Sequence, residues 1–431
     1  MGASDPSWFF PELGVPRFFR RPPTHELILT DTTLRDGQQG SRPFTVEEAM
    51  AIYEVLVELD NGGGVVRDIE LFPYTKKDRE VIRRIKDYAT YPRPIGWVRA
   101  RLEDLRLVKE AGLDETIVLT SVSDYHITYK LGMDRETAKA KYLRAVEEGL
   151  KMGLKLKVAM EDITRCDVYG FLLPFLDEVL RLAERYGTEV RFKLSDTLGM
   201  GLPFVEAPLP RSIPRLIRLL LDDLGLKSTQ LEFHGHNDFH LVVANHLAAW
   251  VYGASLSNCT LLGIGERAGN CPLEAMALFH AQLVKGSPLN LKALREARDL
   301  FLRMGFHVPV FYPILGENAF RTKAGIHIDG LLKNPAIYLP FDPEEVLGIP
   351  YDVEITPYSG RAGLIYWLVK KAGVKDWMSL KGDPRLDMAY REVLNSFEGG
   401  RTEPLSDEEV LGILRRYVPE LVEGIEVWEG R

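Results

Sequence analysis

Between residue 25 and about residue 290 the chain repeats one unit eight times: a short β-branched or apolar run, a polar segment with glycine or proline, and a stretch with helical spacing. The runs are Leu27–Asp31, Val66–Leu71, Ile95–Arg99, Glu115–Thr120, Lys155–Glu161, Glu189–Leu194, Gln230–His236 and Ala254–Leu261. The intervening helical stretches include Val46–Leu59, Asp134–Gly153 and Pro214–Leu224. Eight such units predict a closed parallel (β/α)8 TIM barrel, since a doubly wound sheet more often stops at five or six strands.

The segments outside this repeat have a different character. Residues 1–24 are rich in proline and aromatic residues and predict an N-terminal arm lying on another surface. After about residue 290 the alternation stops, and a small, mainly helical region is expected over 291–431, with helices at Leu291–Met304, Pro343–Leu347 and Asp407–Tyr417. The predicted domains are therefore an arm (1–24), a catalytic barrel (25–290) and C-terminal subdomains (291–431) that contribute to the site and to a dimer.

Composition narrows the class of partner. The 54 Lys and Arg residues against 62 Asp and Glu leave a net charge of −8 without a basic stripe, which argues against nucleic acid and against an anionic membrane surface. No apolar run approaches the ~20 residues of a membrane span, and the N-terminus lacks a signal-peptide layout. The three cysteines form no C-x-x-C pair and are expected to be buried thiols. We therefore expect a cytoplasmic protein that acts on small molecules.

Chemistry-bearing residues gather where the predicted strands end. His234 and His236 end the seventh strand, and residues two apart on a strand face the same side, so both imidazoles can bind one ion. A carboxylate from the segment after the first strand would complete two nitrogens and one oxygen, which suits Mn²⁺, Zn²⁺, Fe²⁺ or Mg²⁺. The glycine-rich loop 263–270 follows the last strand, so it is not a dinucleotide fingerprint, and it lacks the G-K-[ST] of a P-loop. Its Asn270 oxygen can reach the ion instead.

Three motifs resemble those of one enzyme family: D-T-T-L-R-D-G-Q-Q at 31–39, H-G-H-N-D at 234–238 and G-I-G-E-R-A-G-N at 263–270. The chain resembles the acyl-CoA condensing and cleaving metal-dependent TIM barrels, and the resemblance covers about residues 25–365. That group contains isopropylmalate, homocitrate, citramalate and Re-face citrate synthases and hydroxymethylglutaryl-CoA lyase.

The resemblance implies a metal centre and a mechanism. It implies that Asp36, His234 and His236 bind a divalent metal, with Mn²⁺ expected first and Co²⁺, Mg²⁺ or Zn²⁺ as alternatives, and that Asn270 completes or supports this shell. It implies that Arg35 stabilises the enolate oxygen of acetyl-CoA. The chemistry is consistent, because a 2-oxo acid chelates such a metal and the ion polarises its ketone.

The family also uses carboxylate, imidazole and tyrosine groups for proton transfer. Glu161 at the end of the fifth strand and His327 from the appended region match those positions. Tyr338 matches a tyrosine that in relatives reaches the neighbouring subunit's site, so a homodimer is expected.

Substrate-binding candidates follow from the same resemblance. Thr197 matches the threonine that binds the 2-oxo acid carboxylate, and Gln39 and His126 are further candidates. Arg99 and Arg165 can supply the cation that a second carboxylate needs, since burying that group unpaired costs several kcal/mol.

Within the family, the segments 120–126, 198–212 and 359–363 look most like the Re-face citrate synthases, which implies that oxaloacetate is the acceptor. Glu replaces Asp36 in homocitrate synthases, and residues 366–431 are too few for the regulatory domain of an isopropylmalate synthase. The isopropylmalate, homocitrate and citramalate reactions remain the alternatives. A lyase, and a barrel retained as a non-enzymatic scaffold, are less favoured because the synthase motifs are all present.

Overall fold

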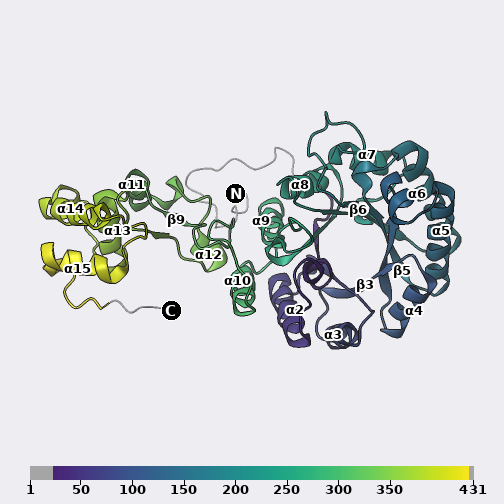
Figure 1. The fold of residues 1–431 in the computed structure, drawn as a ribbon, viewed down its shortest axis with the longest axis horizontal. Helices are drawn as coiled ribbons and strands as arrows, with labels where there is room; N and C mark the ends of the chain where they lie inside the picture. Colours follow the sequence, from purple (N-terminus) through teal and green to yellow (C-terminus); the bar gives the residue numbers. More distant parts are fainter. Residues whose placement is uncertain (1–22, 427–431) are drawn as a thin grey trace. The chain divides into compact units, whose positions relative to one another are not determined.

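The computed structural model describes residues 23–426 and contains a closed barrel of eight parallel strands in sequential order (Figure 1). The strands are β1 (Ile28–Asp31), β2 (Val66–Leu71), β3 (Arg93–Arg99), β4 (Glu115–Ser121), β5 (Lys155–Glu161), β6 (Val190–Asp196), β7 (Leu231–Gly235) and β8 (Leu256–Cys259). Strands β1 and β8 pair in parallel and close the barrel. The predicted fold class is confirmed, and the predicted strand ends differ from the observed ones by two residues at most.

Helices surround the strands, as Figure 1 shows. They are α2 (Val46–Asp60), α3 (Lys76–Lys86), α4 (Leu102–Glu110), α5 (Arg135–Lys151), α6 (Leu173–Arg185), α7 (Ile213–Asp222), α8 (Val242–Tyr252) and α9 (Leu273–Leu283). Several helices begin after a residue whose side chain accepts a hydrogen bond from a free backbone N–H group of the first turn. At α2, Thr45 Oγ1 accepts from Glu48 N at 3.1 Å and Glu48 Oε2 accepts from Thr45 N at 2.8 Å. This capping box fixes where the helix begins.

The interior of the barrel is charged rather than apolar. Along the strands, apolar side chains that pack toward the helices alternate with inward polar ones. The inward charged side chains are all buried, and they are Asp68, Glu70, Lys157, Lys193 and Glu232. Because an unpaired buried charge is costly, these groups have to neutralise one another.

The connection between β6 and α7 is the long loop predicted at 198–212. Leu202 and Ser212 form an isolated bridge in it. Ser212 then caps α7 by accepting from Arg215 N at 3.3 Å. Within the described residues, none of the helices is long and apolar enough to cross a membrane.

The chain divides into two compact units between Phe306 and His307. The predicted boundary lay at 290/291, and the difference arises because α10 (Ala293–Arg303) packs against α2 of the barrel. The predicted N-terminal arm falls almost entirely outside the described residues.

The unit from His307 onward has its own small core. Its elements are β9 (Arg321–Thr322), α11 (Gly325–Lys333), α12 (Pro343–Leu347), β10 (Asp352–Val353), α13 (Gly360–Ala372), α14 (Pro384–Glu398) and α15 (Asp407–Tyr417). Helix α13 packs against α11 and α14, and α14 packs against α15. Leu364, Leu368, Leu386, Val393 and Leu414 are fully buried between them.

Candidate metal centre and active site

Three of the predicted metal ligands converge at the end of the barrel where the strands finish. Asp36 lies in the helical turn Thr33–Gly37 after β1, and His234 and His236 lie on and just past β7. Asp36 Oδ2 is 3.8 Å from His234 Nε2 and 3.7 Å from His236 Nε2. One ligand atom from each of the three lies within 4.8 Å of the others, and all three residues are buried. The structure therefore brings together the two histidines that the spacing paired and the aspartate that the resemblance implied.

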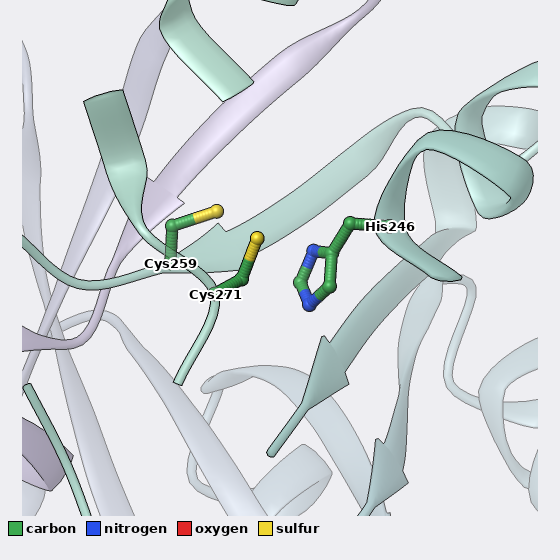
Figure 2. A group of neighbouring side chains, drawn as sticks. All are labelled: His246, Cys259 and Cys271. Atoms are coloured by element: carbon green, nitrogen blue, oxygen red, sulfur yellow. The ribbon is translucent and has the colours of Figure 1, made fainter. Parts of the chain in front are cut away.

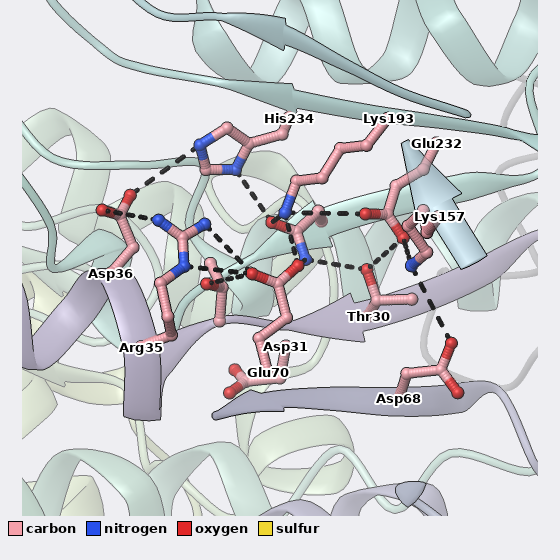
Figure 3. Close-up of polar contacts among 12 residues, drawn as sticks. Thr30, Asp31, Arg35, Asp36, Asp68, Glu70, Lys157, Lys193, Glu232 and His234 are labelled. Atoms are coloured by element: carbon pink, nitrogen blue, oxygen red, sulfur yellow. Dashed lines mark hydrogen bonds and ion pairs between the residues drawn. The ribbon is translucent and has the colours of Figure 1, made fainter. Parts of the chain in front are cut away.

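Hydrogen bonds fix which nitrogen of His234 is free. Asn258 on β8 donates through Nδ2 to Glu70 Oε1 at 2.9 Å, and its Oδ1 accepts from Lys193 Nζ at 2.8 Å. His234 Nδ1 lies 2.8 Å from the same Oδ1 and so must donate to it. The lone pair of His234 is then on Nε2, the nitrogen that faces Asp36 in Figure 3.

The protonation states also suit a cation. Burial lowers the pKa of His234 well below its usual value, with a further contribution from Lys193. Burial likewise lowers the pKa of His236. For Asp36, burial acts to raise the pKa, but Arg35 and the hydrogen bond from Asn270 outweigh it and the pKa is lowered. Two neutral imidazoles beside one ionised carboxylate are the forms in which these side chains bind metals.

Two further atoms at this place lack a hydrogen-bond partner among the described residues: His236 Nδ1 and Asn270 Oδ1, both buried. Asn270 donates through Nδ2 to Asp36 Oδ2 at 2.7 Å. In this arrangement Asn270 holds the Asp36 carboxylate. The donor set of two nitrogens and one oxygen, with unpartnered atoms beside it, fits a divalent metal of the Mn²⁺, Co²⁺ or Zn²⁺ type.

Arg35 joins this centre to the charged interior. Its Nη1 lies 3.1 Å from Asp36 Oδ1, and its Nη2 lies 3.0 Å from Glu70 Oε2. The guanidinium carbon is 5.0 Å from the centre of the Trp97 ring. Burial would raise the pKa of Glu70, but Lys193 and Arg35 outweigh it and lower the pKa to about 2. Glu70 is thus an ionised anchor that fixes the orientation of Arg35.

Glu161 is held as an ion pair at the end of β5. Both of its oxygens lie 2.7 Å from Lys130 Nζ, Ser121 Oγ donates to it, and His126 Nδ1 is 3.0 Å away. Burial acts to raise the pKa of Glu161, but His126 and Lys130 outweigh it and lower the pKa to about 2. A carboxylate held in this way is a weak base until one of these partners moves.

The predicted substrate-binding residues near β5 and β6 form one connected group. Thr197 Oγ1 accepts from Asp162 N at 2.8 Å. Arg165 Nη2 donates to Asp162 Oδ2 at 2.7 Å, and its guanidinium stacks 4.4 Å from the Tyr125 ring centre. Arg165 therefore belongs to the same loop cluster as Thr197.

The other predicted residues are placed differently. Arg99 at the end of β3 is half exposed and donates to Asp104 of α4 at 2.7 and 3.0 Å. Gln39 is exposed on the short helix α1 (Gln38–Gly40). His327 and Tyr338 lie in the C-terminal unit, where their rings are 4.3 Å apart.

The charged interior of the barrel was not predicted from the sequence. Lys193 reaches Glu70, Asn258 and Glu232, while Lys157 reaches Glu232 and Asp68, and Figure 3 shows these contacts. A signal was present, because charged residues recur two positions apart on three strands: Asp68 and Glu70 on β2, Lys155 and Lys157 on β5, and Arg191 and Lys193 on β6. Alternation identifies the inward face, but it does not say which charges meet across the barrel.

The fold is that of a (β/α)8 barrel enzyme, and the chain belongs to the HMGL-like family, whose model matches residues 26–301. Residues 314–368 match the homocitrate synthase post-HMGL domain-like model. The hydroxymethylglutaryl-CoA lyase structure from Pseudomonas aeruginosa has a similar fold, with a TM-score of 0.54 at 17% identity over 67% of this chain and 95% of that one.

The more similar relatives are synthases. A citrate (Re)-synthase from Clostridium kluyveri is 40% identical over 93% of this chain and 89% of its own length. A citrate (Re)-synthase from Syntrophus aciditrophicus is 39% identical over 93% of this chain, but the match spans only 64% of that relative. A 2-phosphinomethylmalate synthase from Streptomyces hygroscopicus is 39% identical over 96% of both chains.

Proposed function

We propose that this chain catalyses a metal-dependent Claisen condensation of acetyl-CoA with a 2-oxo acid, and that the acceptor is oxaloacetate, giving citrate and CoA. The observation that carries this proposal is the buried set of Asp36, His234 and His236 beside Arg35. The identity of 39–40% to two citrate (Re)-synthases over 93% of the chain supports the choice of acceptor.

In this proposal Asp36, His234 and His236 hold one divalent ion, with Mn²⁺ first and Co²⁺, Mg²⁺ or Zn²⁺ as alternatives. Asn270 steadies the Asp36 carboxylate through its 2.7 Å hydrogen bond. When bound, the ion polarises the keto group of the acceptor. The protein fixes the ligands beforehand, so that little reorganisation is needed when substrate arrives.

Condensation requires the removal of one proton from the acetyl methyl group. Arg35 neutralises the negative charge that develops on the thioester oxygen, because Glu70 and Asp36 hold its guanidinium in place. Glu161, His327 and Tyr338 are the proposed proton-transfer groups. With its pKa near 2, Glu161 acts as a base only when its contact with Lys130 loosens, whereas His126 at 3.0 Å can take the proton onward. The methyl carbon then bonds to the keto carbon, the keto oxygen gains a proton, and water hydrolyses the thioester to release CoA.

The acceptor carboxylates need partners of their own. We assign the carboxylate beside the ketone to the Thr197 hydroxyl. Gln39 and His126 are the other substrate-binding residues that we propose. The second carboxylate of oxaloacetate needs a cation, and Arg165 is the stronger candidate because Asp162 links it to Thr197. Arg99 is tied to Asp104 on a more exposed face. The relative that makes 2-phosphinomethylmalate keeps other anionic acceptors open.

We further propose a homodimer in which His327 and Tyr338 act across the subunit interface. The exposed surface of both residues in one chain is compatible with this role. A cytoplasmic location is part of the proposal, and the three free thiols of the chain fit a reducing compartment.

A thiol-release assay tests the reaction and the acceptor together. The panel is acetyl-CoA with oxaloacetate, pyruvate, 2-oxoisovalerate, 2-oxoglutarate and the phosphinate analogue of oxaloacetate. We expect oxaloacetate to release CoA fastest, a chelator to abolish the release, and Mn²⁺ to restore it. Full activity in metal-free protein would overturn the metal proposal, and a preference for 2-oxoisovalerate would replace the citrate reaction with the isopropylmalate reaction.

A further inference from the structure

A second group of metal-binding side chains lies outside the proposed active site. It comprises His246 of α8, Cys259 at the end of β8 and Cys271 just after the 263–270 loop, and we name it the Cys–His cluster (Figure 2). All three residues are fully buried, and one ligand atom from each lies within 4.8 Å of the others. The proposed condensation uses none of the three.

Backbone pairing sets the two thiols side by side. Thr260 N donates to Cys271 O at 3.0 Å, and Leu273 N donates to Thr260 O at 2.8 Å. The residues before this parallel bridge, Cys259 and Cys271, therefore share a register. Figure 2 shows both sulfurs and the imidazole of His246 facing a common space.

The polar atoms of the cluster make few hydrogen bonds, although they are fully buried. Ser257 Oγ lies 2.7 Å from His246 Nδ1 and 3.4 Å from Cys259 Sγ, and the remaining thiol contacts are to carbonyl oxygens at 3.8 and 3.9 Å. His246 Nε2 has no hydrogen-bond partner among the described residues. Burial lowers the pKa of His246 to about 3, so the imidazole is neutral and keeps a lone pair.

We propose that the Cys–His cluster is a structural zinc site, with His246, Cys259 and Cys271 as ligands and Ser257 Oγ or a water in fourth position. Zinc binds thiolates at about 2.3 Å and imidazole at about 2.0 Å in a tetrahedron, which sets the ligand atoms about 3.5–3.8 Å apart. From separations of at most 4.8 Å this requires a contraction of about 1 Å.

Charge favours zinc over other occupants. Binding releases one proton from each thiol to solvent, and Zn²⁺ with two thiolates and one neutral imidazole has no net charge, which lowers the cost of burying the ion. The thiolate-containing donor set is soft, whereas the set at Asp36 contains a carboxylate and two imidazoles. The chain would then hold two metals of different chemistry. The zinc joins α8 and β8 to the segment that follows Asn270, so it acts on the 263–270 loop by restraining it.

Cobalt titration of the reduced, metal-stripped full chain tests the proposal, because Co²⁺ bound to thiolate has a charge-transfer absorption that nitrogen and oxygen ligands do not give. We expect about two Co²⁺ per chain, a thiolate band, and loss of that band when Zn²⁺ is added. Cys259→Ala and Cys271→Ala should each lose the band. Cys166→Ala is the matched control, since this buried thiol lies outside the cluster, and it should keep the band. Asp36→Ala should also keep it while losing the other equivalent.

A measurement on the unmodified chain guards against variants that misfold. Zinc binding at pH 7 should release about two protons per chain, because both thiols must ionise whereas the proposed active-site ligands are already in their binding forms. A folded, reduced chain with no thiolate band and no proton release would overturn the proposal. So would a band that survives in Cys271→Ala, or a thiol titration in denaturant showing that Cys259 and Cys271 form a disulfide in the protein as isolated.

Discussion

At the scale of single residues, the orientation of His234 depends on Asn258, which accepts from its Nδ1 at 2.8 Å. Asn258→Ala should weaken Mn²⁺ binding about 10- to 100-fold, because the imidazole loses the partner that fixes its tautomer. Isothermal titration of metal-stripped protein measures this directly. The matched control is Asn245→Ala, which removes a similarly buried amide of α8 that donates to Gly201 O in the loop after β6. Equal affinities in the two variants would contradict the prediction.

The proposed acceptor cation gives a second residue-scale prediction. Arg165→Met should lower kcat/KM for oxaloacetate by about ten- to several-hundredfold, the cost of losing one charge-assisted pair, and affect residual turnover of pyruvate much less. Arg99→Met is the comparison, because Arg99 is more exposed than Arg165 and pairs with Asp104 of α4 rather than with the Asp162 that binds Thr197, so it should change the ratio little. A larger loss of oxaloacetate turnover in Arg99→Met than in Arg165→Met would contradict the prediction and would place the cation at the end of β3.

Asp31 links stability to pH. Burial raises the pKa of Asp31 to about 7, while hydrogen bonds from Thr33 act to lower it. Since the folded pKa exceeds the unfolded one, the stability it contributes is fully present below pH 4 and is lost as pH rises to about 7. Relative to Asp31→Asn, the metal-free wild type should therefore lose about 3 kcal/mol of unfolding free energy between pH 5 and pH 8. Urea unfolding of the barrel at both pH values measures the difference, and a constant difference would contradict it.

At this scale, the sequence could predict the residues whose positions depend only on where each strand ends. Asp36, His234 and His236 sit at strand ends, and the barrel fold alone brings such ends together. Glu70 and Lys193 could not be assigned roles, because their pairing depends on which inward side chains meet across the closed barrel. The ion pair of Glu161 with Lys130 could not be predicted either, because Lys130 follows β4 whereas Glu161 ends β5.

At the scale of elements, the 263–270 loop depends on a close approach by helix α1. A Cβ at Gly40 would lie 2.0 Å from the carbonyl carbon of Gly265, so even alanine must displace the loop. Gly40→Ala should lower both metal affinity and turnover, because the loop carries Asn270. The control is Gly412→Ala in α15, where a Cβ meets nothing within 4 Å and helix propensity favours alanine by about 0.5–1 kcal/mol. Unchanged metal affinity in Gly40→Ala would show that the loop tolerates the shift.

The elements of the barrel were more predictable than those after it. Strand and helix periods of hydrophobic residues alternate clearly up to α9, so each strand and helix of the barrel can be predicted from its own segment of sequence. Beyond the barrel, helix α11 was not predicted, because glycine and histidine disfavour helix, yet Gly325–Lys333 forms one. Packing of α11 against α13 stabilises this helix although its residues have a low helix propensity.

At the scale of the whole molecule, the proposal that His327 and Tyr338 act on the partner subunit's barrel can be tested by mixing inactive chains. His234→Ala lacks a metal ligand and His327→Ala lacks a proton-transfer group, so each homodimer should be nearly inactive. If the site is shared between subunits, a dimer of one chain of each kind contains one complete site out of two. Random exchange makes half of the dimers mixed, so co-refolded or co-expressed chains should recover up to about a quarter of wild-type activity. A mixture of His234→Ala and Asp36→Ala is the control and should recover nothing, because both changes fall in the same barrel site. Recovery absent from the first mixture, in dimers shown by mass to contain both chains, would mean that His327 serves its own chain or neither.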